Sequence, residues 1–150
     1  MIKLPTKELI DSVEGFHLIS YYTGISVAFA EVVAAGCKRL ALSSPYSGGE
    51  AEAMREPTRI AAEEYGVRLM EETNLLATRL FPADVAEGKT VFLIARDDEV
   101  LAEYARLKEM RRRSDEEGNP EHLELDLAWR FGRLLSYSDE KIAGLLSGRG

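Results

Sequence analysis

Apolar side chains recur every three or four residues over much of the chain, which is the spacing of amphipathic helices. Thr6 can cap a first helix that ends near Gly24, and a second helix over residues 27–35 ends at Gly36. Further helical patterns cover residues 50–65, 98–113, 123–135 and 138–146. Pro57 interrupts the pattern at 50–65, so we expect a new helix to begin at Pro57 rather than one continuous helix.

Short apolar runs predict the strands of a small sheet. These runs are Lys38–Ser43, Val67–Glu71, Thr90–Ala95 and, with a weaker pattern, Leu75–Phe81. A chain of 150 residues fits a single domain. The predicted fold class is therefore α/β, with a mixed α+β arrangement as the alternative. We expect a sheet of three to four strands flanked by helices, with a helical C-terminal subregion at about 121–147.

Charge and composition narrow the classes of partner. A formal net charge of −7 disfavours a general nucleic-acid binder, because phosphate contacts supply most of that affinity. Apolar runs stay shorter than the ~18 residues of a membrane span, and the N-terminus lacks the pattern of a signal peptide. The single cysteine, Cys37, excludes an internal disulfide and fits a reducing compartment. We therefore predict a cytoplasmic protein without nucleic-acid or membrane partners.

Amide side chains are unusually scarce. The chain contains no Gln and only two Asn, Asn74 and Asn119, while Glu and Arg are abundant. Depletion of thermolabile amides together with enrichment in charge is typical of thermophile proteins. Chance or genomic bias is the alternative explanation, and neither reading carries information about chemistry.

The segment between the strand at 38–43 and the helix at 50–65 is the main candidate for a ligand site. Small hydroxyl residues and paired glycines at the carboxyl end of a strand lie where open α/β sheets bind ligands. Backbone N–H groups of such a loop can also bind an anion at the start of a helix. The residues predicted to bind a small anionic or nucleotide-like ligand here are Ser43, Ser44, Tyr46, Ser47, Gly48 and Gly49.

Several features weaken this prediction. The loop matches neither the Walker pattern nor the dinucleotide fingerprint. Glu50 would repel a phosphate unless a metal lay between them, and Pro57 separates the glycines from the main helix. A connecting turn with hydroxyl caps is the alternative.

Each of the other candidate residues can be explained by a structural role as well as by a functional one. Asp97 can bind a ligand or a cation after the strand at 90–95, but Asp is also a favoured helix cap, which we prefer. His17 and Tyr21 would be polar neighbours of the loop if the sheet brings them close, although a partly buried structural histidine is the commoner outcome. No metal site is predicted, since neither histidine has a ligand partner at a metal-binding spacing. Cys37 reads as an inert core thiol. The triplet Arg111–Arg113 reads as a solvated helix end.

The C-terminal segment from Trp129 to Ser138 carries apolar residues on more than one side of its helix, which indicates a core helix or a subunit interface. Its run Phe131-Gly132-Arg133-Leu134-Leu135-Ser136-Tyr137 resembles the Gly-Arg-Leu-Leu-Gly-Tyr-Pro signature of a mainly archaeal family of unknown function. Residues 23–28 and 94–97 are loosely similar to that family as well. The family usually continues with adjacent cysteines, whereas this chain continues with Ser138-Asp139-Glu140-Lys141. The resemblance implies no activity, cofactor or catalytic residue.

Two functional hypotheses follow. The first is a protein or enzyme that binds a small anionic ligand through the 43–50 loop, with no catalytic residue or cofactor identified. The second is a non-catalytic oligomerisation or scaffold module, with a homodimer formed through the helices at 123–146.

Overall fold

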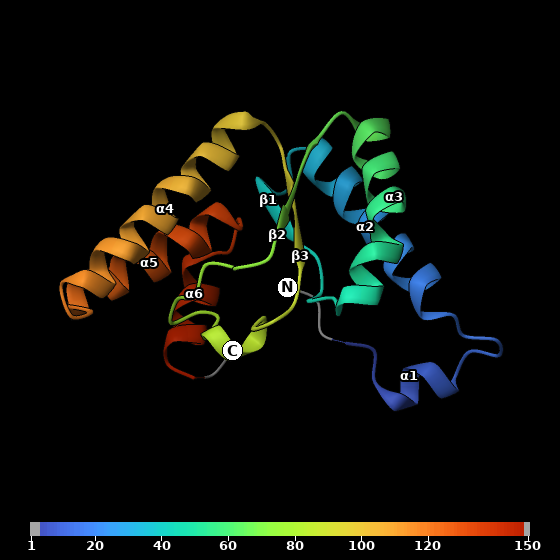
Figure 1. Cartoon of the computed structure of the whole chain (residues 1–150), viewed down its shortest axis with the longest axis horizontal. Helices are drawn as coiled ribbons and strands as arrows, with labels where there is room; N and C mark the ends of the chain where they lie inside the picture. Colours follow the sequence, from blue (N-terminus) through green and yellow to red (C-terminus); the bar gives the residue numbers. More distant parts are fainter. Residues whose placement is uncertain (1–3, 149–150) are drawn as a thin grey trace.

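A small sheet stands between two helical layers in the computed structural model, which describes residues 4–148. The strands are β1 (Leu40–Leu42), β2 (Arg68–Glu72) and β3 (Val91–Ala95), in the spatial order β1-β3-β2. Figure 1 shows α2 and α3 on one side of this sheet and α4, α5 and α6 on the other. The predicted mixture of helices with a small sheet is confirmed.

Both outer strands run antiparallel to the central strand. Leu40 pairs with Ala95 and Leu42 with Leu93 on one side of β3, and Arg68 pairs with Ala95 on the other side. Strands β1 and β2 therefore point the same way, but β3 lies between them and α3 connects them, as in a split β-α-β unit. The carboxyl end of β1 consequently lies beside the start of β3.

The central strand is buried on both faces, which explains why the run Val91–Ala95 is apolar without alternation. Val91, Leu93 and Ala95 belong to the core beneath α4 and α5. Phe92 and Ile94 pack instead with residues of α2 and α3. Successive side chains of a strand point to opposite faces, so this one strand supplies both halves of the core.

The N-terminal helices are α1 (Lys7–Asp11) and α2 (Leu18–Ala34). Thr6 caps α1 by accepting a hydrogen bond from Leu9 N at 3.2 Å, as predicted. The predicted stop at Gly24 is wrong, because α2 continues through it to Ala34. Helix α2 packs along α3 and against the sheet, and this burial outweighs the cost of about 1 kcal/mol for a glycine inside a helix.

Helix α3 (Gly48–Tyr65) runs through Pro57 without a break, so the predicted restart at Pro57 is wrong. Pro57 removes one backbone hydrogen bond from the helix. Thr58 Oγ1 donates to Met54 O at 2.6 Å on the buried face. Residues on both sides of Pro57 are buried: Met54 lies in one core cluster with Tyr22 and Phe92, and Ala61 lies in another with Ala30 and Ile94. Each half of the helix thus packs against residues of α2 and β3. Tertiary packing therefore keeps the two halves of α3 in line.

The connection from β2 to β3 contains only a short 3₁₀ turn, η1 (Ala83–Val85), so the predicted strand at Leu75–Phe81 is wrong. Leu76, Thr78 and Leu80 are buried while Arg79 is exposed, and this partial alternation produced the strand-like pattern. The segment packs its buried side chains against α4, α5 and α6 and pairs with no strand.

The C-terminal half consists of α4 (Asp98–Glu116), α5 (Glu121–Leu134) and α6 (Asp139–Leu146). Asp97 caps α4 by accepting from Val100 N at 3.0 Å, and Ser138 caps α6 by accepting from Lys141 N at 3.1 Å. The cap at Asp97 was predicted. The apolar face of α5 lies in the core, with Leu127, Phe131 and Leu134 buried.

Candidate functional site

Residues Ser43 to Tyr46 continue the edge of the sheet beyond β1. Ser43 N donates to Phe92 O at 3.0 Å, and Phe92 N donates back to Ser43 Oγ at 2.9 Å. Ser43 Oγ in turn donates to Ser44 O at 2.8 Å, and Tyr46 forms a backbone bridge with Thr90. Ser43, Ser44 and Tyr46 are all buried. The first half of the predicted ligand loop is therefore part of the core.

Ser47, Gly48 and Gly49 are exposed and form the start of α3. The glycines open an 18-residue helix directly, contrary to the separation expected from Pro57. A Cβ atom at either glycine would meet nothing within 4 Å, so packing does not require glycine there. Glu50 Oε1 accepts from Ser47 N at 2.9 Å. A carboxylate thus occupies the helix end where an anionic ligand would have to bind.

An aromatic cluster links this loop to the first turns of α2. The ring centroids of Tyr22 and Tyr46 lie 4.8 Å apart, those of Tyr46 and Phe92 5.7 Å, and those of Tyr21 and Tyr22 6.0 Å. Burial raises the pKa of Tyr46, although side-chain hydrogen bonds with Ser26 and Ser43 lower it in part. Tyr22 Oη is the one buried side-chain N or O atom without a hydrogen-bond partner among the residues described.

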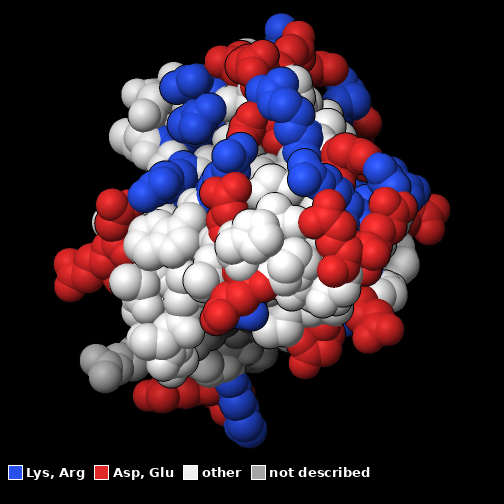
Figure 2. All heavy atoms as spheres, turned by 90° about the vertical axis from the view of Figure 1, so that its left-hand side faces the viewer, with Lys and Arg blue, Asp and Glu red and all other residues white. Residues whose placement is uncertain are grey.

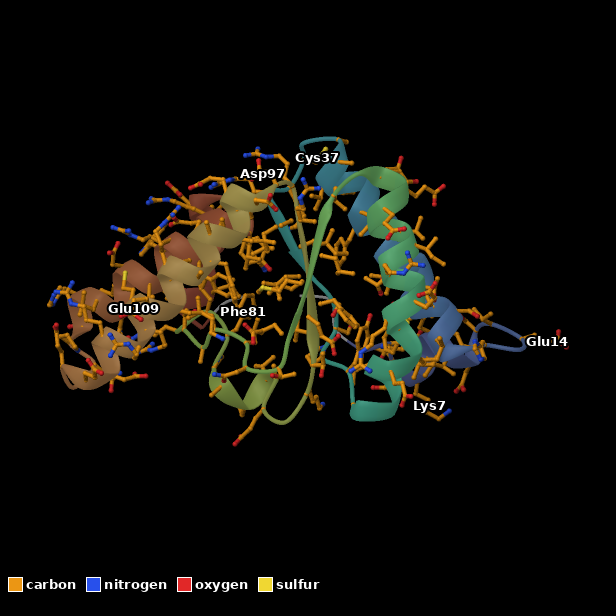
Figure 3. The ribbon with its side chains drawn as sticks, turned by 45° about the horizontal axis from the view of Figure 1, so that its top comes forward. Lys7, Glu14, Cys37, Phe81, Asp97 and Glu109 are labelled. Carbon is orange, nitrogen blue, oxygen red and sulfur yellow. The ribbon has the colours of Figure 1, made fainter. Side chains whose placement is uncertain are left out.

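The structure brings only some of the predicted site residues together. Tyr21 joins the aromatic cluster beside Tyr22. His17 is exposed, so the expectation of a partly buried histidine is wrong, and it caps α2 by accepting from Ser20 N at 3.2 Å. Asp97 lies at the opposite end of the sheet, because it follows β3 and β3 runs antiparallel to β1. Figure 3 shows Asp97 at the same end as Cys37. Cys37 is exposed, so the prediction of a core thiol is wrong.

A hollow of about 490 Å³ lies between the segment after β2 and the helices α4 and α5. Its volume is in the range of small-molecule sites. Two neighbouring hollows of about 230 and 320 Å³ share Ala77 and Ala83 with it, so the three form one groove. We call this the α4 groove and define it by the lining of the largest hollow: Asn74, Leu75, Leu76, Ala77, Ala83, Lys108, Arg111, Asp115, Asn119 and Glu124.

A buried carboxylate organises one end of the α4 groove. Glu72 Oε2 accepts from Lys108 Nζ and from Tyr104 Oη, each at 2.9 Å, and Glu72 Oε1 accepts from Asn74 N at 2.8 Å. Burial alone would raise the pKa of Glu72, but these three hydrogen bonds outweigh it and hold the pKa below its ordinary value. Burial raises the pKa of Tyr104, whose hydroxyl also accepts from Leu76 N.

A second network forms the other end. Arg111 Nη2 lies 2.5 Å from Glu124 Oε2 and 2.9 Å from Asp115 Oδ1. Arg111 Nη1 donates to Ala77 O at 3.3 Å, and Ser114 Oγ donates to Glu124 Oε2 at 3.1 Å. The side chains of Arg111 and Glu124 are only 18% and 13% exposed. This ion pair is therefore much less screened by solvent than the surface pairs of α4.

Both asparagines of the chain line the α4 groove, although they lie far apart in the sequence. Asn119 Nδ2 donates to Asp115 Oδ1 at 2.6 Å, and the φ of Asn119 is 58°, a left-handed conformation that Asn adopts more readily than most residues. Asn74 uses its backbone N–H and C=O on Glu72 and Lys108. The two amide side chains of this sequence thus line the same hollow.

Sequence reasoning missed this site. The sequence pattern that could have revealed it is the spacing of Tyr104, Lys108, Arg111 and Asp115, which places their polar groups on one face of α4. The prediction of a solvated helix end is wrong for Arg111. It fits Arg112 and Arg113, whose side chains are 58% and 66% exposed. Figure 2 shows Lys and Arg interleaved with Asp and Glu over the face that carries these helices.

The structure adds two observations about other classes of site. Within residues 4–148, no group of three or more His, Cys, Asp or Glu residues could hold a metal ion. Over the same residues, no helix is long and apolar enough to cross a membrane.

Comparisons with known proteins found no family model, no curated protein and no solved structure that matches the chain.

Proposed function

We propose that this protein binds a small polar molecule in the α4 groove. The observation that carries the proposal is the convergence of two cations, two carboxylates and both asparagine amides on one hollow of about 490 Å³. A concave site with several convergent polar groups and perturbed pKa values is the usual form of a small-molecule site. Leu75, Leu76, Ala77 and Ala83 supply the apolar surface that such sites also need.

The chemistry of the groove favours binding over acid–base catalysis. Lys108 and Arg111 are both engaged by carboxylates, and Glu72 holds a hydrogen bond from the Tyr104 hydroxyl. Because burial raises the pKa of Tyr104, its hydroxyl keeps its proton at neutral pH. None of these groups is therefore a free general base, which must be able to take a proton from the ligand.

The same reasoning favours the α4 groove over the 43–50 loop. Ser43 uses its hydroxyl on the backbone of Phe92 and Ser44, and Glu50 occupies the start of α3. A ligand at the loop would have to break these contacts. The α4 groove is already open and can accept a ligand without such a change.

A thermal-shift screen tests the proposal. The panel includes amines, amino acids, polyols, nucleotides, sugar phosphates, coenzymes and divalent metals. A ligand at 100 times its dissociation constant should stabilise the fold by about 2.7 kcal/mol. Ala83→Phe introduces a large side chain into a position that lines all three hollows, so it should remove the shift produced by a groove ligand.

Ala105→Phe is the matched control, since Ala105 is an exposed residue of α4 that does not line the groove. A ligand that shifts both variants equally binds elsewhere, and this result would contradict the proposal. Gly48→Ala combined with Gly49→Ala tests the 43–50 loop in the same assay, because neither added Cβ meets a neighbour.

The second proposed function is a homodimer through the helices at 123–146. Its support is a group of apolar side chains on α5 and α6 that are not fully buried, among them Leu125, Trp129, Leu145 and Leu146. Light scattering gives the mass directly. Trp129→Ala should shift a dimer toward the monomer, and a monomeric mass for the unchanged chain would remove this proposal.

A further inference from the structure

We infer that the ligand of the α4 groove carries a protonated amine and a neutral polar group. The inference rests on the proposed function, because it names the ligand class for the same site. It is drawn from the balance of charge in the groove, from the carboxylate oxygens left without a partner, and from the two amides at its edge.

The lining of the groove carries two cations and two carboxylates, and Glu72, which contacts Lys108 from outside this lining, adds a third carboxylate. The charged network as a whole is therefore net negative. Glu72, Asp115 and Glu124 contact Lys108 and Arg111, so three carboxylates face two cations. Lys108 Nζ already contacts Glu72 and the carbonyl oxygen of Asn74, and Arg111 already contacts two carboxylates and the carbonyl oxygen of Ala77. An anionic ligand would meet cations that are neutralised and carboxylates that repel it.

Two carboxylate oxygens remain available to a donor. Among residues 4–148, both contacts of Glu124 fall on Oε2, from Ser114 Oγ and Arg111 Nη2. All contacts of Asp115 fall on Oδ1, from Arg111 and Asn119. Both carboxylates touch the same nitrogen, Arg111 Nη2, so they are neighbours at one end of the guanidinium group. An ammonium group, with three donors and a positive charge, is the ligand group that best suits two neighbouring carboxylates.

The amides define the other part of the ligand. Asn74 and Asn119 are neutral, and each carries both donor and acceptor atoms. Such side chains suit a hydroxyl or amide group better than a second charge. The apolar residues Leu75 and Ala83 line the same hollow and suit a short hydrocarbon spacer in the ligand.

Three probes of equal length separate the ligand classes. 4-Amino-1-butanol carries an ammonium and a hydroxyl group, 4-hydroxybutyrate replaces the ammonium with a carboxylate, and 1,4-butanediol is neutral. Each is titrated into the full-length chain at low salt while backbone amide signals are followed by NMR. We expect saturable shifts from the amino alcohol at residues 74–77, 83 and 115–124, and none at these positions from the carboxylate.

Asp115→Asn tests the charge without removing the oxygen that Arg111 and Asn119 use. It should weaken the binding of the amino alcohol about tenfold, as expected for the loss of one charge-assisted hydrogen bond. Asp126→Asn is the matched control, because it removes the same charge from a surface pair with Arg130 on α5. Equal weakening in both variants would mean general attraction to an acidic protein, and it would overturn the inference.

The remaining outcomes separate the inference from the proposed function. Groove shifts with 4-hydroxybutyrate that exceed those with the amino alcohol overturn the inference but support a binding site. An absence of groove shifts with the amino alcohol also overturns it, and the broader thermal-shift screen with Ala83→Phe then decides the proposed function alone. Saturable amine binding that Ala83→Phe abolishes and Asp115→Asn weakens supports both.

Discussion

Two tyrosines of the core differ in what their hydroxyl groups contact. Tyr104 Oη accepts from Leu76 N at 3.1 Å and donates to Glu72 Oε2 at 2.9 Å. Tyr22 Oη is equally buried but contacts no donor or acceptor within residues 4–148. A buried polar group without a partner loses its hydrogen bonds to water and gains none in return. The same chemical group should therefore have opposite effects on stability at the two positions.

Tyr22→Phe should raise the free energy of unfolding by about 1 kcal/mol, because it removes an unsatisfied hydroxyl and keeps the ring. Tyr104→Phe should lower it by about 1–3 kcal/mol, because Leu76 N then lacks an acceptor. Urea denaturation of the three proteins measures both changes. A clear loss of stability in Tyr22→Phe would show that its hydroxyl has a partner in solution.

The Glu72 carboxylate should make stability depend on pH. Its pKa in the folded chain lies below the ordinary value, so its contribution is present above the unfolded pKa of about 4.3 and is lost as pH falls through the folded pKa. Glu72→Gln should lower the free energy of unfolding by about 1–3 kcal/mol at pH 7. The gap to the unchanged protein should narrow as the pH falls below about 4.

Urea denaturation from pH 7 to pH 3 measures this gap. Glu63→Gln is the control, since Glu63 forms an exposed pair with Arg59 on α3 and such pairs contribute little. A gap for Glu72→Gln that stays constant over the whole range would contradict the assigned ion pair with Lys108.

At the scale of elements, Gly132 allows α5 and α6 to approach closely. A Cβ atom at this position would lie 2.6 Å from Ile142 Cγ1 and 3.1 Å from Leu80 Cδ1, and Ile142 is fully buried. Ser136, which lies just after the end of α5, has a φ of 63°, in the region that favours glycine. Both positions are glycines in the archaeal signature that the chain resembles. Membership of that family stays a prediction, but helix packing and turn geometry supply a physical reason for the pattern.

Gly132→Ala should lower the free energy of unfolding by about 1–3 kcal/mol, because Ile142 must move within a packed core. Gly144→Ala is the matched change inside α6, where the added Cβ meets nothing within 4 Å. It should raise stability by about 0.4–1 kcal/mol through the loss of chain entropy in the unfolded state. Thermal unfolding compares the two variants, and equal effects would contradict the close contact between α5 and α6.

Helix starts that are capped by a residue close in the sequence could be predicted from the sequence. The caps at Thr6, Asp97 and Ser138 were predictable because each bonds an N–H group three residues further on. The predictions at Gly24 and Pro57 were wrong for a different reason. Packing between α2 and α3 stabilises both helices although each contains a helix-breaking residue. Distant partners decide such cases, and a pattern within one segment contains no information about them.

The α4 groove was unpredictable for the same reason. Its residues come from the segment after β2, from α4 and from α5, and only the fold brings Asn74 beside Arg111 and Glu124. Each residue alone has an ordinary reading as a turn former or a surface charge. The loop at 43–50 was conspicuous because its chemistry is concentrated in one short segment. Local concentration of polar residues is a different property from convergence in space.

At the scale of the whole molecule, burial is distributed unevenly along the chain. All five residues of β3 are buried, whereas α1 has no buried residue. The apolar side chains of α1 and of the segment just after it remain open, with Leu9 41%, Ile10 37% and Val13 49% exposed. A helix of one or two turns without packing is marginal in water. The N-terminal part of the chain should therefore open far more easily than the sheet.

Hydrogen–deuterium exchange measures this difference. Amides of residues 8–12 should exchange at close to unprotected rates, and those of residues 91–95 should require global unfolding. Helix α6 is the internal control, because it is also short at 8 residues but buries Ile142 against α5. It should be protected at an intermediate level, which separates the effect of burial from that of helix length.

Strong protection of residues 8–12 would contradict this view of α1, because nothing within residues 4–148 buries its apolar side chains. The dependence on protein concentration then identifies the cause. Protection that increases with concentration means that a second copy covers Leu9, Ile10 and Val13, since association follows mass action. Protection that stays constant means that α1 packs within its own chain. A homodimer through the 123–146 helices would leave residues 8–12 unprotected and protect α5 and α6 instead, so one experiment separates the two surfaces.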